Sequence, residues 1–292
     1  MIRIAVISGK GGTGKTMVTA ALAEILPGPL VLADCDVDAA NLGLYLSPET
    51  IGSEPFTGMK KATIDPEKCT SCDTCRAHCR FGAVLADDGN YQIDLFRCEG
   101  CGVCVQVCPA GAVALYDHRA GEVISSRTSR GNLTSARLEP GEGNSGLLVH
   151  AVKARAVREN PERDLFLIDG PPGTGCPLIS TASGTDAVLI VTEPSVSGIH
   201  DLERVVAVCR RFKPQIFVAI NRFDLDCGHT EAIKAWCRQQ GLTVIGTIPF
   251  DPAVLSHARE GIPVTRDADS PAAQAIRSIA EKLQKEVSHH GT

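Results

Sequence analysis

Two groups of residues in this chain have the types and spacing that chemistry requires, and the first lies near the N-terminus. Gly9 is followed, after four residues, by Gly14, Lys15 and Thr16, which is the phosphate-loop pattern G-x4-G-K-S/T. Glycines let the backbone turn its N–H groups toward phosphate oxygens, and a following helix adds its positive N-terminal end. We expect Lys15 to contact the β- and γ-phosphates of a nucleotide and Thr16 to ligate Mg²⁺. A chance glycine loop is the alternative, but strand, loop and helix patterns occur here in the order that a nucleotide site requires.

The second group consists of cysteines. Eight of the thirteen cysteines lie between positions 69 and 108, where the pattern C-x2-C-x2-C-x3-C occurs twice. Bacterial proteins bind [4Fe–4S] clusters with this run, and in two-cluster proteins the fourth cysteine of each run ligates the other cluster. We therefore expect one cluster on Cys69, Cys72, Cys75 and Cys108. The second cluster is expected on Cys98, Cys101, Cys104 and Cys79. Tetrahedral zinc sites are the alternative, since C-x2-C pairs also suit Zn²⁺.

The cysteine-rich segment is short, and this affects both its folding and its role. About fifty residues bury too little apolar surface to be stable by packing alone, so we expect the clusters to be required for folding. Two neighbouring clusters provide a path for electrons. Cys108 is followed by proline, whereas Cys79 is followed by Arg80, and this cation is expected to raise the potential of the second cluster.

The composition describes an ordinary globular chain apart from its cysteines. Of 292 residues, 43% are hydrophobic and 22% are charged, which is enough apolar content for a sizeable core. The net charge of −5 and the aromatic content of 4% argue against nucleic acid as a partner. The sequence MIRIAVISGK is not a signal peptide, and no apolar stretch reaches the ~18 residues of a membrane helix. We expect a cytoplasmic protein without stable membrane association, and in that reducing compartment clustered cysteines more often bind metal than form disulfides.

Strand and helix patterns alternate on both sides of the cysteine-rich segment. Strands are predicted within 3–12, 29–36, 164–173, 187–194, 215–222 and 243–251, and helices within 14–26, 145–160, 198–212, 230–240 and 270–287. Residues 121–138 are predicted to form paired strands around a glycine turn. This alternation predicts an α/β fold with a mostly parallel sheet flanked by helices.

Lys10 precedes the expected phosphate-binding lysine by five residues, and this pair of lysines indicates a family. The sequence KGGTGKT resembles the deviant phosphate loop (deviant Walker A) of the MinD/Mrp superfamily of P-loop ATPases, which includes the nitrogenase iron protein and ParA-type ATPases. The resemblance implies that Lys10 reaches across a dimer interface to the partner's nucleotide. A lysine there can neutralise charge on the transferred phosphoryl group. A solvated loop lysine is the alternative.

Two further segments resemble the nucleotide-responsive regions of this family. The sequence DCDVDAANL, with Asp34, Asp36 and Asp38, resembles the first switch, and Asp38 matches the carboxylate that orients the attacking water. A solvated acidic turn is the alternative. The sequence LFLIDGPPGTG resembles the Walker B strand and the second switch, which implies that Asp169 binds Mg²⁺.

The resemblance therefore implies a complete nucleotide site. Asn221 and Arg222, with the sequence PFD at 249–251, fall where the family contacts the base. The expected catalytic residues are Lys10, Lys15 and Asp38. The expected nucleotide-binding residues are Gly9, Lys10, Gly11, Gly12, Thr13, Gly14, Lys15, Thr16, Asp34, Asp36, Asp169, Asn221 and Arg222, with Thr16 also a metal ligand.

The cysteine-rich block resembles a two-cluster bacterial ferredoxin domain that is inserted into the nucleotide-binding domain. We expect the P-loop ATPase domain at 1–60 and 119–292 and a small α+β ferredoxin-like insert at 61–118. Mrp-type cluster carriers often have a C-terminal C-x2-C pair, and this chain has none after residue 119. Cys176 follows Asp169 at the separation that a cluster-ligating cysteine has in the nitrogenase iron protein; a buried residue at the dimer interface is the alternative.

These features together imply an ATP-binding and ATP-hydrolysing homodimer with ATP, Mg²⁺ and two [4Fe–4S] clusters as cofactors. Its nucleotide state is expected to be coupled to electron transfer or to iron–sulfur or metallocofactor assembly. The expected partner is an electron-transfer or cluster-acceptor protein. The alternative function is that of a MinD/ParA-like positioning or scaffold ATPase in which the insert is a redox sensor.

Overall fold

The computed structural model describes residues 1–288, and it divides the chain into two compact units. Unit 1 comprises Met1–Glu54, Val123–Arg137 and the chain from Ser145 onward, and unit 2 comprises Pro55–Glu122 and Leu138–Asn144. The segment 61–118, expected as an insert, lies within unit 2. Unit 2 also takes in 138–144, so the chain passes from one unit to the other after Glu54, Glu122, Arg137 and Asn144.

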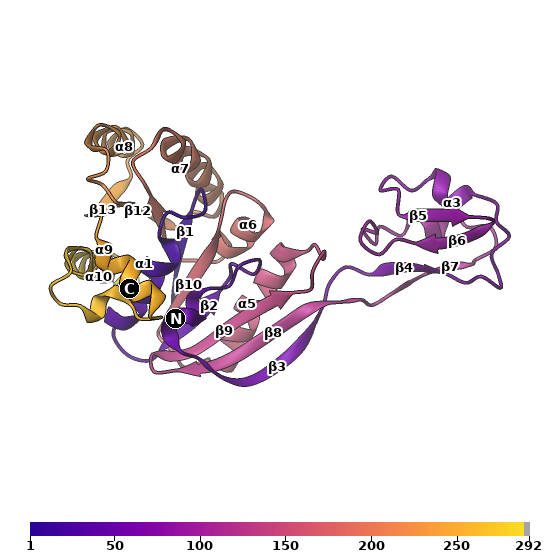
Figure 1. The fold of residues 1–292 in the computed structure, drawn as a ribbon, viewed down its shortest axis with the longest axis horizontal. Helices are drawn as coiled ribbons and strands as arrows, with labels where there is room; N and C mark the ends of the chain where they lie inside the picture. Colours follow the sequence, from indigo (N-terminus) through magenta and orange to yellow (C-terminus); the bar gives the residue numbers. More distant parts are fainter. Residues whose placement is uncertain (289–292) are drawn as a thin grey trace. The chain divides into compact units, whose positions relative to one another are not determined.

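A nine-stranded sheet runs through unit 1 in the order β13-β12-β11-β1-β10-β2-β9-β8-β3 (Figure 1). The strands are β1 (Ile2–Ser8), β2 (Leu30–Asp34), β3 (Glu49–Thr57), β8 (Arg119–Thr128), β9 (Gly131–Leu138), β10 (Leu165–Pro172), β11 (Ala187–Thr192), β12 (Gln215–Asn221) and β13 (Thr243–Ile248). Neighbouring strands from β13 to β9 pair in parallel. Only two residues join β8 to β9, a connection typical of an antiparallel hairpin. The predicted mostly parallel sheet is confirmed.

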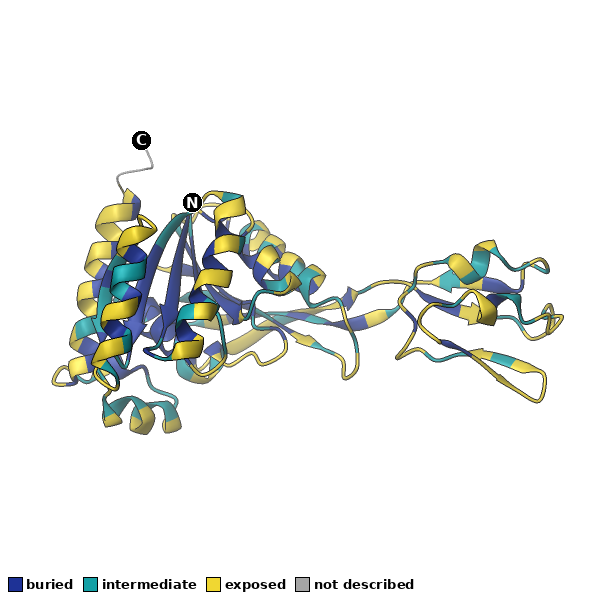
Figure 2. Ribbon diagram, turned by 90° about the horizontal axis from the view of Figure 1, so that it is seen from above, coloured by how far each residue is buried: buried dark blue, intermediate teal, exposed yellow. Residues whose placement is uncertain are grey.

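The central strands are apolar almost throughout because helices cover both faces of the sheet. The side chains of Ile4, Val6 and Leu167 belong to the core cluster that also contains residues of α1 and α10. Their neighbours along the strands, such as Ile7 and Ile168, point to the opposite face and are fully buried there too. Figure 2 shows the result, with buried strands enclosed by helices whose outer sides are exposed.

The helices form a layer on each face of the sheet (Figure 1). One layer contains α1 (Lys15–Ile25), α2 (Leu42–Leu46) and α10 (Pro271–Ser288). The other contains α5 (Ser145–Glu159), α6 (Cys176–Ala182) and α7 (Val196–Cys209), which pack on β2, β10, β1 and β11. Helices α8 (Cys227–Gln239) and α9 (Pro252–Arg259) flank β13, and short 3-10 turns lie at Arg210–Phe212 and Val264–Arg266. Of residues 1–288, no helix is long and apolar enough to cross a membrane.

Unit 2 is a small α+β structure with an internal repeat. Two antiparallel pairs form its strands, β4 (Lys61–Ile64) with β7 (Val113–Tyr116) and β5 (Val84–Asp87) with β6 (Asn90–Ile93). Its helices are α3 (Thr74–Ala77) and α4 (Val103–Gln106). Each element of the first half recurs 29 residues later, β4 as β6, α3 as α4 and β5 as β7. The core is small and is built around Ala62, Ala83, Cys98 and Val113.

Four elements of the sheet domain are absent from the sequence prediction, namely the short helices α2 and α6, strand β3 and helix α9. Strand β3 is exposed at nearly every position and contains Gly52 and Pro55, so it lacks the apolar alternation that marks a strand. Helix α9 has only eight residues, none of them buried, so it gives little helical periodicity.

Candidate functional site

A cleft of about 890 Å³ lies at the carboxyl ends of the parallel strands, where α/β proteins bind their ligands. Of the residues predicted to bind nucleotide, those lining the cleft are Gly11, Gly12, Thr13, Gly14, Lys15, Thr16, Asp36, Asn221 and Arg222. Asp38 also lines it. The lining also includes large apolar and aromatic side chains, namely Leu44, Tyr45, Phe250 and Leu255. The cleft therefore combines the polar glycine loop with apolar side chains.

The loop between β1 and α1 has the backbone geometry that phosphate binding requires. Gly12 and Gly14 have φ angles of 82° and 91°, which favour glycine over other residues. Asn221, at the end of β12, donates its side-chain amide to the carbonyl of Thr13 at 2.8 Å. Arg222 donates to the carbonyl of Gly12 at 3.5 Å. Both residues predicted to contact the base thus hold the phosphate loop from the side.

Lys15 lies buried within a group of oxygen atoms. Its Nζ is 3.2 Å from Asp169 Oδ1 and 3.5 Å from Asp36 Oδ2. Thr19 donates its hydroxyl to the same Asp169 Oδ1 at 2.9 Å. Within residues 1–288, Asp169 Oδ2 is buried and has no hydrogen-bond partner. Because buried carboxylate oxygens are normally paired, this orphaned oxygen fits a carboxylate that ligates Mg²⁺ or one of its waters.

The three acids that follow β2 occupy different environments. Asp34 is almost fully buried, and its carboxylate accepts backbone N–H groups of Asp36 at 3.1 Å and Leu42 at 2.9 Å. Burial, reinforced by the charge of Asp169, raises the pKa of Asp34 to about 8. Burial also raises the pKa of Asp36. Asp38 is exposed and lines the cleft. Asp34 does not line the cleft; its contacts hold the loop that carries Asp36 and Asp38.

Lys10 is not among the residues that line the cleft of its own chain. Its Nζ is 2.6 Å from Glu193 Oε1 and donates to the hydroxyls of Ser197 at 3.0 Å and Ser195 at 3.3 Å. Glu193 follows β11, the neighbour of β1 in the sheet, and its second oxygen lies 3.6 Å from Arg222. The two loop lysines therefore have separate surroundings. Lys15 contacts the acids of the cleft, and Lys10 contacts an acid outside it.

Cys176 is the first residue of α6 and is exposed. A Cβ atom placed on Gly146, the second residue of α5, would lie 3.0 Å from Cys176 Cβ. The starts of α5 and α6 are therefore in close contact, and Gly146 makes room for Cys176. The exposed position contrasts with Cys35, Cys209 and Cys237, which are buried.

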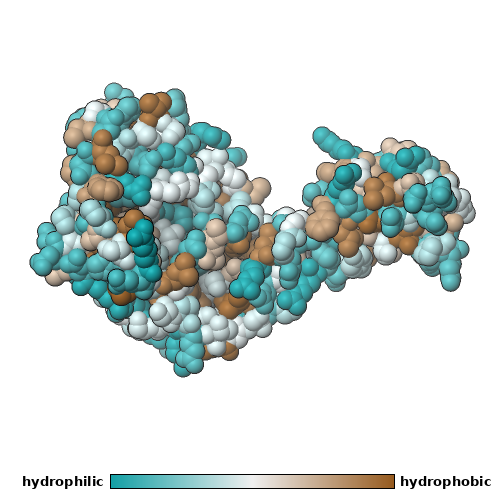
Figure 3. All heavy atoms as spheres, in the orientation of Figure 1, coloured by the Kyte–Doolittle hydropathy of each residue, from teal (hydrophilic) through white to brown (hydrophobic). Residues whose placement is uncertain are grey.

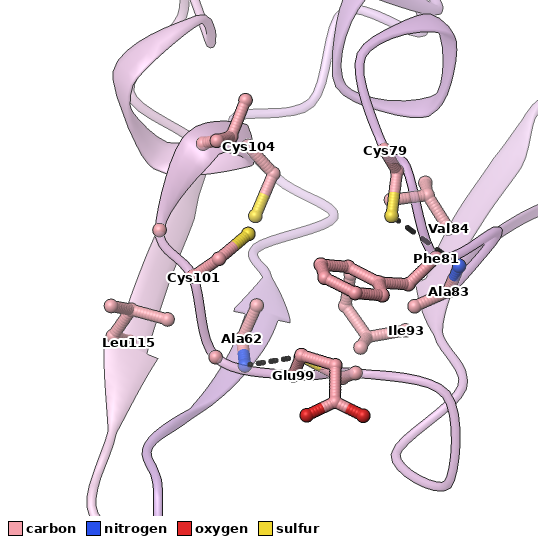
Figure 4. A pocket seen from close by; sticks show the side chains of 14 residues that line it. Ala62, Cys79, Phe81, Ala83, Val84, Ile93, Glu99, Cys101, Cys104 and Leu115 are labelled. Atoms are coloured by element: carbon pink, nitrogen blue, oxygen red, sulfur yellow. Dashed lines mark hydrogen bonds between the residues drawn. The ribbon is translucent and has the colours of Figure 1, made fainter.

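The eight clustered cysteines surround two separate hollows in unit 2. One hollow is lined by Cys69, Cys72, Cys75 and Cys108. The other is lined by Cys79, Cys98, Cys101 and Cys104, and Figure 4 shows the thiols of Cys79, Cys101 and Cys104 beside it. The division of the cysteines is the one that the two predicted ligand sets require.

The sulfur atoms in these hollows have neighbours typical of cluster ligands. Backbone N–H groups of Ala83 and Ala112 donate to the sulfurs of Cys79 at 3.4 Å and Cys108 at 3.3 Å. All thirteen cysteines are free thiols. Within residues 1–288, no three Cys, His, Asp or Glu side chains converge on a point that a single metal ion would occupy. Four thiols around a hollow, with amide donors on their sulfurs, fit a [4Fe–4S] cluster, in which each thiolate binds a different iron.

Large hydrophobic side chains are exposed near the second hollow. They are Phe81, Leu85, Leu95, Phe96 and Val103, and Figure 3 shows hydrophobic atoms among the hydrophilic ones on the visible face of unit 2. Phe81 and Val103 also line the hollow itself.

Sequence reasoning missed several charged residues. Glu193 was not predicted to contact Lys10, because that contact depends on β11 lying beside β1. Lys61 and Glu142, which form a buried ion pair in unit 2, were also missed. Little in the sequence signals the latter pair, because Lys61 begins a four-residue strand that mixes polar and apolar residues.

Comparisons with known proteins agree with this geometry. The family model described as the CobQ/CobB/MinD/ParA nucleotide binding domain matches residues 4–264. An uncharacterized protein of Methanocaldococcus jannaschii is 30% identical over 287 residues, which cover 98% of this chain and 97% of the relative. An iron–sulfur cluster carrier protein of Pyrococcus abyssi is 27% identical over 299 residues, covering 96% of this chain and 85% of that one.

Among solved structures, the cell division ATPase MinD of Pyrococcus furiosus matches with a TM-score of 0.59 at 22% identity, covering 98% of this chain and 99% of that one. This likeness concerns the fold. The family match spans most of the chain and includes the phosphate loop, the acids after β2 and Asp169. The chain therefore belongs to the CobQ/CobB/MinD/ParA nucleotide-binding domain family.

Proposed function

We propose that this protein is a dimeric ATPase that couples its nucleotide state to the handling of electrons or iron–sulfur clusters. The observation that carries the proposal is the presence, in one chain, of a P-loop cleft and two hollows with four cysteines each. The 27% identity to an iron–sulfur cluster carrier protein supports this pairing. Electron transfer and cluster transfer both remain within the proposal.

In the cleft, each residue has a role that follows from its position. The N–H groups of the glycine loop and the Lys15 ammonium bind the phosphates of ATP. Thr16 and Asp169 would hold Mg²⁺, which neutralises charge on the phosphates when bound. Asp38 orients a water for attack on the terminal phosphorus. Removing any of these groups lowers the rate without removing the fold.

Lys10 has its place in the proposal as a residue that acts on the partner's nucleotide. Its contacts with Glu193 and two serines keep its ammonium outside its own cleft. A second protomer that binds across this face would bring its phosphates to Lys10, where the positive charge stabilises the transition state. Hydrolysis would then require two chains.

The experiment is an anaerobic preparation with iron and sulfide analysis, followed by electron paramagnetic resonance (EPR) with and without ATP. The proposal predicts about eight irons per chain, four for each cluster, and a spectrum that changes when ATP and Mg²⁺ are added. Iron content near zero would remove the iron–sulfur half. If the protein hydrolyses ATP but its EPR spectrum does not change with ATP, the proposed coupling between nucleotide and clusters is wrong.

The alternative, a positioning ATPase that binds membranes or scaffolds, is less well supported. Helix α10 is the amphipathic element nearest the C-terminus, and its apolar side is buried, including Ile276, Ile279 and Leu283. That side packs against the sheet and α1 and is not a free surface. A liposome sedimentation assay with and without ATP discriminates the two functions, since the proposed function predicts no ATP-dependent sedimentation.

A further inference from the structure

Unit 2 contains a buried ion pair that neither the nucleotide site nor the cysteines require. Lys61 Nζ, at the start of β4, lies 3.4 Å from Glu142 Oε2, and both side chains are more than 90% buried. The other carboxylate oxygen of Glu142 lies 3.0 Å from His118 Nε2. Glu142 lies in the segment 138–144, and 81 positions separate it from Lys61 in the sequence. Burying two charges is costly unless both are well paired, so a pair retained here calls for a role.

The Lys61 ammonium contacts the backbone of one of the predicted cluster ligands, Cys98. It donates to the backbone carbonyls of Leu95 at 2.9 Å and Cys98 at 3.0 Å. The next residue, Ala62, donates its N–H to the Cys98 sulfur at 3.5 Å; Figure 4 labels Ala62 and draws a dashed line from its nitrogen. The first two residues of β4 therefore place a full positive charge and an amide dipole beside Cys98.

The internal repeat shows that this arrangement occurs in one half only. Cys98 corresponds to Cys69, 29 residues earlier, and Lys61 corresponds to Asn90, 29 residues later. Asn90 is uncharged and exposed. The cations near the other hollow are Lys68 and Arg76, whose side chains are 64% and 53% exposed and pair with surface aspartates.

Charges at these two places have different effects. Solvent and salt screen an exposed cation, whereas a buried one acts at close range through a medium of low dielectric constant. Arg80, which the sequence suggested as the cation near the second cluster, is exposed and is screened in the same way. In contrast to Lys68, Arg76 and Arg80, Lys61 is buried.

We propose that Lys61 raises the reduction potential of the cluster on Cys79, Cys98, Cys101 and Cys104 above that of the other cluster. This inference rests on the proposed presence of both clusters. One electron from a low-potential one-electron donor adds one negative charge to the pair of clusters, and no bond is made or broken. Lys61 stabilises that charge on its own side, so the electron resides beside Cys98. The carbonyls of Leu95 and Cys98 hold the ammonium in place, and the negative charge of Glu142 at 3.4 Å partly opposes its field. Lys61 is a positioning residue that tunes the potential of this cluster.

The test is a redox titration with dithionite, followed by EPR, of the anaerobic full-length protein. The wild type is expected to show two resolved one-electron steps. Lys61→Met removes the charge and keeps the chain length, so the higher step should fall by at least a factor of ten in its equilibrium constant, about 59 mV, while the lower step stays. Glu142→Gln should move the higher step upward. The matched control is Lys60→Met, because Lys60 is adjacent and 57% exposed and should change neither step.

The possible results are separable. Wild-type protein without two clusters overturns both this inference and the proposed function. Wild-type protein with two clusters whose potentials coincide, or a Lys61→Met protein whose higher step is unmoved, overturns the inference alone. Equal shifts of both steps indicate a purely structural role and also overturn it. If Lys61→Met fails to retain iron, Glu142→Gln decides, since an upward shift of one step supports the inference and no shift refutes it.

Discussion

The contact between Lys10 and Glu193 leads to a prediction about dimer formation. In a single chain Lys10 is held by one carboxylate at 2.6 Å and two hydroxyls. If Lys10 acts on the partner's nucleotide, these contacts must break in both protomers when the dimer closes. The substitution Glu193→Gln removes the charge that holds Lys10 and leaves a side chain of the same size. It should therefore favour the ATP-bound dimer.

The size of the effect follows from the exposure of the pair. The side chains of Lys10 and Glu193 are 31% and 22% exposed, so the pair is intermediate between a surface ion pair and a buried one. Surface pairs contribute about 0.2–1 kcal/mol, and charge-assisted hydrogen bonds somewhat more. We take about 1 kcal/mol for each protomer, which gives about 2 kcal/mol for a dimer, or roughly a 30-fold lower dissociation constant.

The assay is the ATPase rate per chain as a function of protein concentration. For Glu193→Gln, the midpoint of the rise should move to lower concentration by up to about 30-fold, with the same plateau. The control is Glu203→Gln on α7, since Glu203 contacts only His200 at 3.8 Å among its ion pairs in residues 1–288. An unchanged midpoint would refute the reasoning. A lower plateau would mean that Glu193 works in the closed dimer instead.

Three further predictions concern the cleft, its pH dependence and the iron. Lys15→Ala should lower kcat by about 10²–10³-fold because it removes a positive charge from the phosphates. Asp38→Asn should lower kcat but leave ATP affinity within a factor of a few. A fluorescent-nucleotide titration in which Asp38→Asn loses as much affinity as Lys15→Ala would contradict this. Burial gives Asp34 a pKa of about 8 in the folded chain against 3.8 ordinarily, so between these values the folded state binds one more proton than the unfolded state. The unfolding free energy of nucleotide-free protein should therefore fall as pH rises from about 4 to 8 and level off above. In thermal melts Asp34→Asn should flatten this slope, and an unchanged slope would mean that another group causes it. Anaerobic removal of iron should unfold unit 2 and spare unit 1. Limited proteolysis should then cut within 55–122 and 138–144 while nucleotide binding persists. A protease-resistant unit 2 without iron would show that packing suffices.

The sequence predicted the sheet domain well because its signals are local. Buried parallel strands such as 187–192 are continuous apolar runs, and amphipathic helices such as 145–159 alternate with them at regular intervals. The phosphate loop and the cysteine runs are also local, since their spacing alone brings the groups to one site. Strand 49–57 was missed because its exposed side chains carry no apolar alternation.

The parts of the site that could not be predicted depend on contacts between distant segments. The partner of Lys10 follows from strand order, which places β11 next to β1. The pairing of Lys61 with Glu142 joins β4 to a loop after β9, and neither residue belongs to a recognisable motif. Asp34 was expected at the nucleotide, but its carboxylate accepts the backbone N–H groups of the loop that follows it. The alternating acids of the sequence do not indicate this local turn.

The return of the 138–144 segment to unit 2 has a practical consequence for anyone who wishes to trim this protein. Excising residues 61–118 alone would discard Lys61 and His118 and leave Glu142 behind as an orphaned carboxylate. A clean nucleotide-binding core would instead delete Pro55 to Glu122 and replace the segment 138–144, which connects β9 to α5, with a short polar turn. Conversely, a transplanted unit 2 would have to carry both pieces of chain to keep its buried lysine paired with Glu142.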